Sequence, residues 1–210
     1  MHKISKADWD KVARIMSSLV GVPLWAITTK KSYSRHIPYL DLDSSSSMLE
    51  LGSSTGICSR FLAKKFGVRR ITLVDRSEYA LRLAVVNSDD DVELTCINQD
   101  IFDLNLQERF DLVHSEGLLE HFSRADAKRL FKRHLELVRP GGYLLITVPT
   151  PTFRYRLSRK ALELTHTWIF GYEKPFTEQE LVALFEEAGV EILSKVKTWH
   201  NIGILGRRPQ

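Results

Sequence analysis

The sequence is poor in cysteine and lacks long apolar runs and internal repeats, and each absence excludes a class of protein. Two cysteines in 210 residues, Cys58 and Cys96, are too few for a disulfide framework, so we expect both to be small buried hydrophobic residues. No apolar run approaches the roughly 18 residues of a membrane span, and residues 1–6 lack the apolar core of a secretory signal. These absences predict a cytoplasmic protein with no membrane partner.

Length and charge limit the organisation of the chain. A chain of 210 residues with 43% hydrophobic content predicts one globular domain with a short appended element. We expect a helical N-terminal extension over residues 1–46, a serine linker at 44–47, and the main domain over residues 47–210. The net charge of +4 is mildly basic; it allows an acidic or nucleic-acid substrate and demonstrates neither.

Residues 48–56, Met-Leu-Glu-Leu-Gly-Ser-Ser-Thr-Gly, are the most informative segment. An apolar run ends here in a small-residue loop, and residues 57–66 follow with a helical pattern. A strand that feeds a helix through a glycine turn presents backbone N–H groups to a ligand. A dinucleotide fingerprint would place glycines at positions 52, 54 and 57, but Ser54 and Ile57 occupy the last two. This mismatch disfavours a nicotinamide oxidoreductase.

The rest of the chain alternates between short apolar runs and amphipathic segments. This alternation is typical of a parallel sheet with helices on both faces. Ser77, Ser123 and Thr177 are expected helix caps, Thr177 together with Glu180 as a capping box. The expected strands are 48–51, 71–75, 92–97, 110–114, 143–148, 190–198 and 203–207, the last two as an antiparallel hairpin, and the expected helices are 57–66, 77–87, 123–138 and 177–189.

The acid-x-Gly-x-x-x-Gly loop resembles that of class I S-adenosylmethionine (SAM) methyltransferases, and three further phrases are similar to that family. They are Phe-Asp-Leu-Val-His-Ser-Glu-Gly-Leu-Leu-Glu-His-Phe at 110–122, Leu-Val-Arg-Pro-Gly-Gly-Tyr at 137–143 and Phe-Thr-Glu-Gln-Glu-Leu at 176–181. The likeness covers about residues 36–208; Ser54 departs from it, because the family usually has glycine there. The resemblance implies a Rossmann-like, mostly parallel sheet of seven strands with a terminal antiparallel hairpin, and SAM as cofactor.

The resemblance also implies a cofactor site. A carboxylate after the second strand, Asp75, matches a ribose diol, with capping of the next helix as the alternative. Asp100 would receive the adenine amine, with an Asx turn as its alternative. Glu50 would help to hold the methionine ammonium, since a charged residue in an apolar strand is costly without a partner. The implied cofactor residues are Glu50, Gly52, Ser54, Gly56, Asp75, Arg76, Asp100, Ile101, Ser115 and Glu116.

The pair Glu120-His121 leaves three interpretations open. An imidazole near the methyl acceptor could act as a base, because its ordinary pKa lies close to neutrality. Some methyltransferases carry Glu-x-x-Glu-His at this place and bind a divalent metal, but Gly117 stands at the first position and Glu116 is one residue away. His121 could also be a packing residue that lines the pocket. We expect no metal and keep His121 as the candidate catalytic residue.

Substrate choice is expected to reside in two added segments. The first is the N-terminal region, with an amphipathic helix near residues 9–19 and a basic stretch at 30–36, which includes Tyr33 and is expected to form a lid. The second is an insertion over residues 150–175, in which Arg154 and Trp168 are expected to border the substrate. The alternative for its arginines is one solvated helix face.

The sequence predicts methyl transfer from SAM to an O, N or C nucleophile, with a small-molecule acceptor as the first choice. RNA or another nucleic acid is the alternative acceptor, and a non-catalytic SAM-binding or partner-binding protein is an alternative of another class. A monomer or a homodimer is expected.

Overall fold

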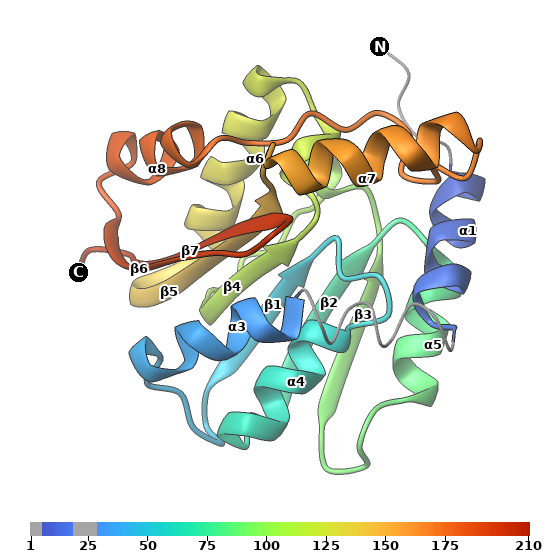
Figure 1. Cartoon of the computed structure of the whole chain (residues 1–210). Coiled ribbons are helices and arrows are strands. Elements are labelled where there is room, and N and C mark those ends of the chain that lie inside the picture. The colour runs from blue at the N-terminus through green and yellow to red at the C-terminus, as the bar shows by residue number, and fades with distance from the viewer. Residues whose placement is uncertain (1–5, 19–28) are drawn as a thin grey trace.

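The computed structural model of the chain describes residues 6–18 and 29–210. A sheet of seven strands forms its centre, in the order β3-β2-β1-β4-β5-β7-β6, and helices cover both faces (Figure 1). The strands are β1 (Ser47–Leu51), β2 (Arg70–Asp75), β3 (Glu93–Asn98), β4 (Phe110–Glu116), β5 (Val138–Pro149), β6 (Glu191–Lys197) and β7 (Asn201–Arg207).

Strand pairing follows the sequence pattern. β1 is buried at every position and pairs in parallel with β2 on one side and β4 on the other, as its uninterrupted apolar character requires. β7 lies antiparallel to both β5 and β6. The predicted fold class, a mostly parallel Rossmann-like sheet with a terminal antiparallel hairpin, is confirmed.

Four of the described helices begin where a serine or threonine side chain caps them. The helices are α1 (Lys6–Met16), α3 (Lys31–His36), α4 (Ile57–Phe66), α5 (Glu78–Val86), α6 (Arg124–Leu137), α7 (Phe153–Leu164) and α8 (Glu178–Glu187), with short 3-10 turns at η2 (Ile37–Tyr39), η3 (Ile101–Asp103) and η4 (Leu119–His121). The Ser77 side chain accepts from the Ala80 N–H, and Thr177 and Glu180 form the predicted capping box. Among the described helices, none is both long and apolar enough to cross a membrane.

Two hydrophobic cores lie on opposite faces of the sheet. One joins the sheet to α6 and α8, and the other joins it to α3, α4 and α5. Cys58 is buried in the second core, with 2% of its surface exposed, whereas Cys96 is only partly buried on β3, the edge strand. Neither forms a disulfide among the described residues, and only Cys58 is a buried residue.

The N-terminal region divides into two parts with different positions. α1 lies along α5 (Figure 1), where the Arg14 guanidinium stacks on the Tyr79 ring at 4.0 Å. α3 instead packs against β6 and β7, and its Tyr33 is fully buried. Tyr33 is therefore part of the core, and the lid role expected for the N-terminal region stays a prediction. The predicted helix near residues 9–19 is described only to Met16, followed by a turn; residues 19–28 lie outside the described part of the chain.

Candidate functional site

The site lies at the topological switch point of the sheet, where the strand order reverses. β1 and β4 are neighbours in the sheet although β2 and β3 come between them in the sequence. Ligands of open α/β sheets bind at such a switch point, outside the carboxyl ends of the strands. A cavity of about 460 Å³ opens there, lined by the ends of β1, β2 and β4, by Trp9 and Val12 of α1, and by residues between Pro149 and Glu173.

The loop after β1 forms one wall and needs unusual backbone angles. Gly52, Ser54 and Gly56 all have positive φ, of 67°, 47° and 65°. A side chain is disfavoured in this region, which explains why glycine is usual where this chain has Ser54. A Cβ atom on Gly56 would lie 2.6 Å from the Leu73 Cδ1 atom, so close packing also demands glycine there.

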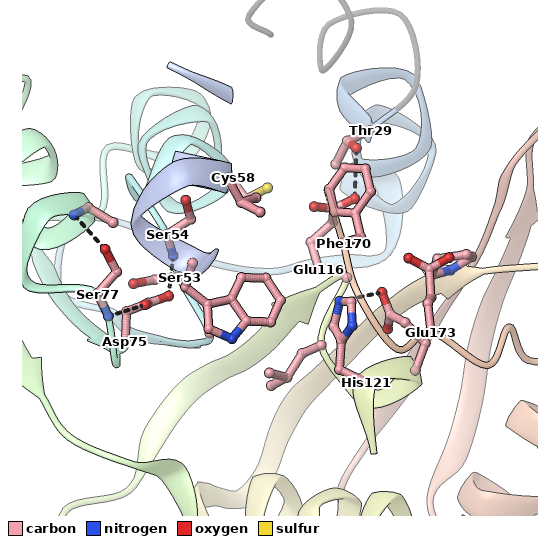
Figure 2. A pocket seen from close by; sticks show the side chains of 18 of the residues that line it. Thr29, Ser53, Ser54, Cys58, Asp75, Ser77, Glu116, His121, Phe170 and Glu173 are labelled. Carbon is pink, nitrogen blue, oxygen red and sulfur yellow. Dashed lines mark hydrogen bonds and ion pairs between the residues drawn. The ribbon is translucent and has the colours of Figure 1, made fainter. Parts of the chain in front are cut away.

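Asp75 ends β2 and lies directly below this loop (Figure 2). The Ser54 N–H donates to its Oδ2 atom at 2.7 Å, and the Ser77 N–H donates to its Oδ1 atom at 2.8 Å. Burial raises the pKa of Asp75, and these backbone bonds oppose the rise. Each carboxylate oxygen keeps a second lone pair, so the group is held in place and still able to accept from a diol.

Asp100 and Ile101 follow β3 and also line the cavity. Asp100 accepts from the Phe102 N–H at 3.0 Å, which is the Asx turn that was the alternative interpretation, and its Oδ2 atom lies 3.6 Å from the Arg76 Nε atom. The turn uses one oxygen of the carboxylate. The Asx turn is therefore present and the carboxylate also lines the cavity, whereas its role toward adenine stays a prediction.

Glu50 lies in a buried polar network beneath the cavity. Its Oε2 atom accepts from the Ser59 N–H at 3.1 Å and from the Ser59 hydroxyl at 2.6 Å, and that hydroxyl lies 3.0 Å from the His114 Nε2 atom. The Tyr33 hydroxyl lies 3.4 Å from the other ring nitrogen. Burial raises the pKa of Glu50 to about 8 and lowers that of His114 to about 3. At neutral pH the Glu50 carboxyl group therefore favours its protonated form, and the His114 ring carries no charge.

The opposite end of the cavity collects acidic side chains (Figure 2). Glu116 at the end of β4 accepts from the Thr29 hydroxyl at 2.9 Å, and Glu173 accepts from the Tyr155 hydroxyl. Glu120 on η4 is 1% exposed, and its Oε2 atom has no hydrogen-bond partner among the described residues. Burial raises the pKa of all three carboxyl groups.

His121 lies between these acids. Its Nδ1 atom lies 2.8 Å from the Tyr172 carbonyl oxygen and donates to it, and burial lowers the pKa of the ring to about 4. The lone pair is then on Nε2, which lies 3.7 Å from the Glu120 Oε1 atom. Glu120, His121 and Glu173 each offer one acceptor atom, and these atoms all lie within 4.8 Å of one another. They are the described residues placed to hold a cation.

Most of the predicted site residues line the cavity. Those that do are Glu50, Gly52, Ser54, Asp75, Arg76, Asp100, Ile101, Glu116, His121 and Trp168.

Four predicted residues do not line it. Gly56 lies at the base of the loop and packs on Leu73, and Ser115 is fully buried within β4. Tyr33 is in the core, and Arg154 stacks over the exposed Trp199 ring at 4.3 Å. The placement of Tyr33 and Arg154 in a substrate pocket is corrected, because α3 packs inward and Arg154 is on the solvent-facing side of α7.

Sequence reasoning missed several cavity residues. Trp9 of α1 packs edge-on against the His121 ring, with ring centroids 4.8 Å apart. Tyr155 and Glu173 form a hydrogen-bonded pair across the insertion, and Asn201 starts β7. An acid in the aromatic stretch at 168–176 was the available signal for Glu173. No signal in the sequence indicated that Asn201 lines the cavity, because its position there depends on the pairing of β7 with β5.

Comparisons with known proteins agree with this geometry. The family model described as a methyltransferase domain matches residues 26–195. Malonyl-(acyl-carrier protein) O-methyltransferase of Priestia megaterium is 30% identical over 153 residues, which are 69% of this chain and 54% of the relative. A second protein of this name, from Ilyobacter polytropus, is 30% identical over 95 residues, 45% of this chain and 35% of its own. The chain thus spans about half or less of the length of the curated relatives it matches.

Solved structures share the fold at lower identity. The N-methyltransferase NodS of Bradyrhizobium japonicum, solved with S-adenosyl-L-homocysteine (SAH), has a TM-score of 0.69 and 18% identity, covering 97% of this chain and 99% of its own. A complex of the Haloferax volcanii Trm112 methyltransferase activator with a methyltransferase gives a TM-score of 0.74 at 17% identity, covering 96% and 98%.

Proposed function

This chain belongs to the methyltransferase domain family, and we propose that it transfers a methyl group from SAM to a nucleophilic atom of a small molecule. The prediction of a class I SAM-dependent methyltransferase is confirmed at the level of the family. The observation that carries the proposed activity is the position of Asp75 at the switch point, below the glycine loop and open to the cavity. A carboxylate placed in this way matches the two hydroxyls of a ribose.

The residues present fit SAM. Asp75 would hold the ribose, Asp100 and Ile101 would face the adenine, and Glu50 with the Gly52 backbone would serve the methionine part. When bound, SAM supplies a methyl group on a positively charged sulfonium. Six carboxylate side chains and two arginines line the cavity among the described residues, a balance that favours cationic ligands: Glu50, Asp75, Asp100, Glu116, Glu120 and Glu173, with Arg76 and Arg159.

The chain's own contribution to the reaction is alignment and exclusion of water. Trp9 from α1 and Trp168 from the insertion cover the cavity from two sides and would exclude solvent from the reacting groups. His121 and Glu120 would border the acceptor. A nucleic-acid acceptor is disfavoured, because its phosphates would meet the acidic end of the cavity.

Calorimetry with SAM and SAH, followed by a transfer assay with labelled SAM on a metabolite pool, tests this proposal. We expect both compounds to bind, and bound SAH to stabilise the fold by about 2.7 kcal/mol at 100 times its dissociation constant. NAD serves as the negative control and should not bind. Absence of SAM and SAH binding would refute the proposal. Binding without transfer to any compound of the pool would support the non-catalytic alternative.

A further inference from the structure

The acidic end of the cavity holds more negative charge than the described part of the chain neutralises. Glu120 and Glu173 are buried, Glu116 is partly buried at the end of β4, and all three line the cavity. Among the described lining residues there is no lysine, and Arg159, the arginine on this side, is shared: its guanidinium bonds the Glu163 carboxylate at 2.8 Å and also donates to the Tyr155 hydroxyl and the Glu173 carbonyl oxygen. Burying carboxylates without a cation is costly, so this arrangement calls for a positively charged ligand.

The second observation is the unpartnered oxygen of Glu120. The residue is only 1% exposed to solvent, yet Oε2 has no hydrogen-bond partner within the described residues, and the residue lines the cavity. A buried acceptor without a donor is rare in native structures. An N–H group of a ligand would satisfy this atom.

The spacing of the acceptors suits an ammonium group better than a small metal ion. Neighbouring ligands of an octahedral ion of Mg²⁺ size, at about 2.1 Å from the metal, lie about 3 Å apart, less than the 3.7 Å between His121 Nε2 and Glu120 Oε1. An ammonium nitrogen with hydrogen bonds of about 2.9 Å separates its acceptors by up to about 4.7 Å. The three acceptor atoms of Glu120, His121 and Glu173 lie within 4.8 Å of one another, which is the span of an ammonium group.

The surroundings of the acids are aromatic. Phe170 lines the same cavity as Glu116, and the Phe170 ring contacts the Trp168 ring with centroids 5.2 Å apart. Trp9 lies against His121 from the other side. Aromatic faces next to carboxylates attract an organic cation and pack against its hydrocarbon part.

We propose that the methyl acceptor is an amine carried on an apolar or aromatic body, bound through its nitrogen by the carboxylates of Glu120 and Glu173. This inference rests on the proposed methyltransferase function and names its substrate class. Glu116, bonded to Thr29 and Asn201, completes the negative wall and does not contact the nitrogen.

The chemistry balances within the site. An ammonium group has no lone pair, so it first gives one proton to a carboxylate of this wall. The nitrogen then uses its lone pair to form the new N–C bond, while the electrons of the broken C–S bond stay on sulfur. The amine gains one methyl cation and loses one proton, so its net charge is unchanged and no further reactant is needed.

Three probes of the same shape test the inference on the protein saturated with SAH: 2-phenylethylamine, 2-phenylethanol and 3-phenylpropanoate. Calorimetry should show the amine binding at least tenfold more tightly than the alcohol, and the carboxylate more weakly than both. Glu120→Gln and Glu173→Gln should each reduce the preference for the amine about tenfold, with SAH affinity unchanged. Glu108→Gln, an exposed change of the same charge, should leave the preference intact.

Equal binding of the three probes, or preferred binding of the carboxylate, would overturn the inference while SAH binding kept the proposed function intact. An amine preference that disappears in chelator and returns with Mg²⁺ would also overturn it, because a metal ion would then occupy the acids. Failure of the wild-type protein to bind SAH would instead refute the proposed function itself.

Discussion

Replacing Glu50 by glutamine should change how the stability of the ligand-free protein depends on pH. Burial raises the pKa of Glu50 from 4.5 to about 8, although the Ser59 N–H and hydroxyl both donate to it. Between these two values the folded protein holds a proton that the unfolded chain has released. The stabilisation is therefore complete below the unfolded pKa and is lost as the pH rises toward about 8.

The size of the effect follows from the width of the pH range between the unfolded pKa of 4.5 and the folded pKa of about 8. Each pH unit within it changes the free energy of unfolding by about 1.4 kcal/mol for one proton. From about pH 5 to about pH 8 the wild-type protein should lose as much as about 4 kcal/mol through this single group. Glu50→Gln keeps the shape and the acceptor oxygen but cannot ionise, so this part of the pH dependence should disappear.

Chemical denaturation of both proteins at four or five pH values measures the difference. The other acids whose pKa burial raises, Asp75, Glu116, Glu120 and Glu173, are present in both proteins, so the difference between the two curves reports Glu50 together with its coupling to Asp75 and Glu116. Glu108→Gln supplies the control for an exposed carboxylate and should retain the wild-type slope. Parallel curves for wild type and Glu50→Gln would show that Glu50 is ionised throughout and would refute the reasoning.

Further changes test the loop, the cofactor site and the insertion. Gly56→Ala should destabilise the fold by about 1–3 kcal/mol more than Gly67→Ala in denaturation, because both positions have positive φ but only the first would place its Cβ against Leu73. Asp75→Ala should weaken SAH binding by about 1.5–3 kcal/mol in calorimetry; unchanged affinity would remove Asp75 from the site. Trp168→Ala should lower turnover by about tenfold with SAH affinity intact, and a parallel loss of thermal stability and SAH binding would make it a core residue. Activity should persist in chelator, and metal analysis should find no stoichiometric divalent ion.

Local signals predicted much of the fold and the cavity residues that follow β1, β2 and β3. Ser77 and Thr177 act as the caps that their sequence context indicated, and residues 48–56 form the expected strand and loop. These features depend on neighbours within a few residues, where side-chain chemistry decides the backbone. β5 was underestimated: it begins at Val138 because Phe110 pairs with that residue, so the Arg-Pro-Gly-Gly segment that ends α6 continues directly into the strand.

Long-range packing accounts for what could not be predicted. The basic residues of α3 favoured an exposed lid, but Tyr33 and His36 of that helix are fully buried against the sheet. The helix packs inward because β6 and β7 provide the surface that it contacts. No local sequence pattern predicts that contact. Glu120 and Glu173 are likewise separated by 52 residues, and only the path of the insertion back over β4 brings their side chains together.

Charge shows most clearly why composition alone misleads about the ligand. The net charge of +4 kept a nucleic-acid acceptor open, yet the described cavity lining has six carboxylates against two arginines. Net charge is dominated by solvated surface residues, whose fields are screened within about 10 Å at 0.1 M salt. Buried carboxylates are screened far less and act directly on the bound molecule. We therefore expect the acidic interior of the cavity, and not the net charge, to govern recognition and to favour cations.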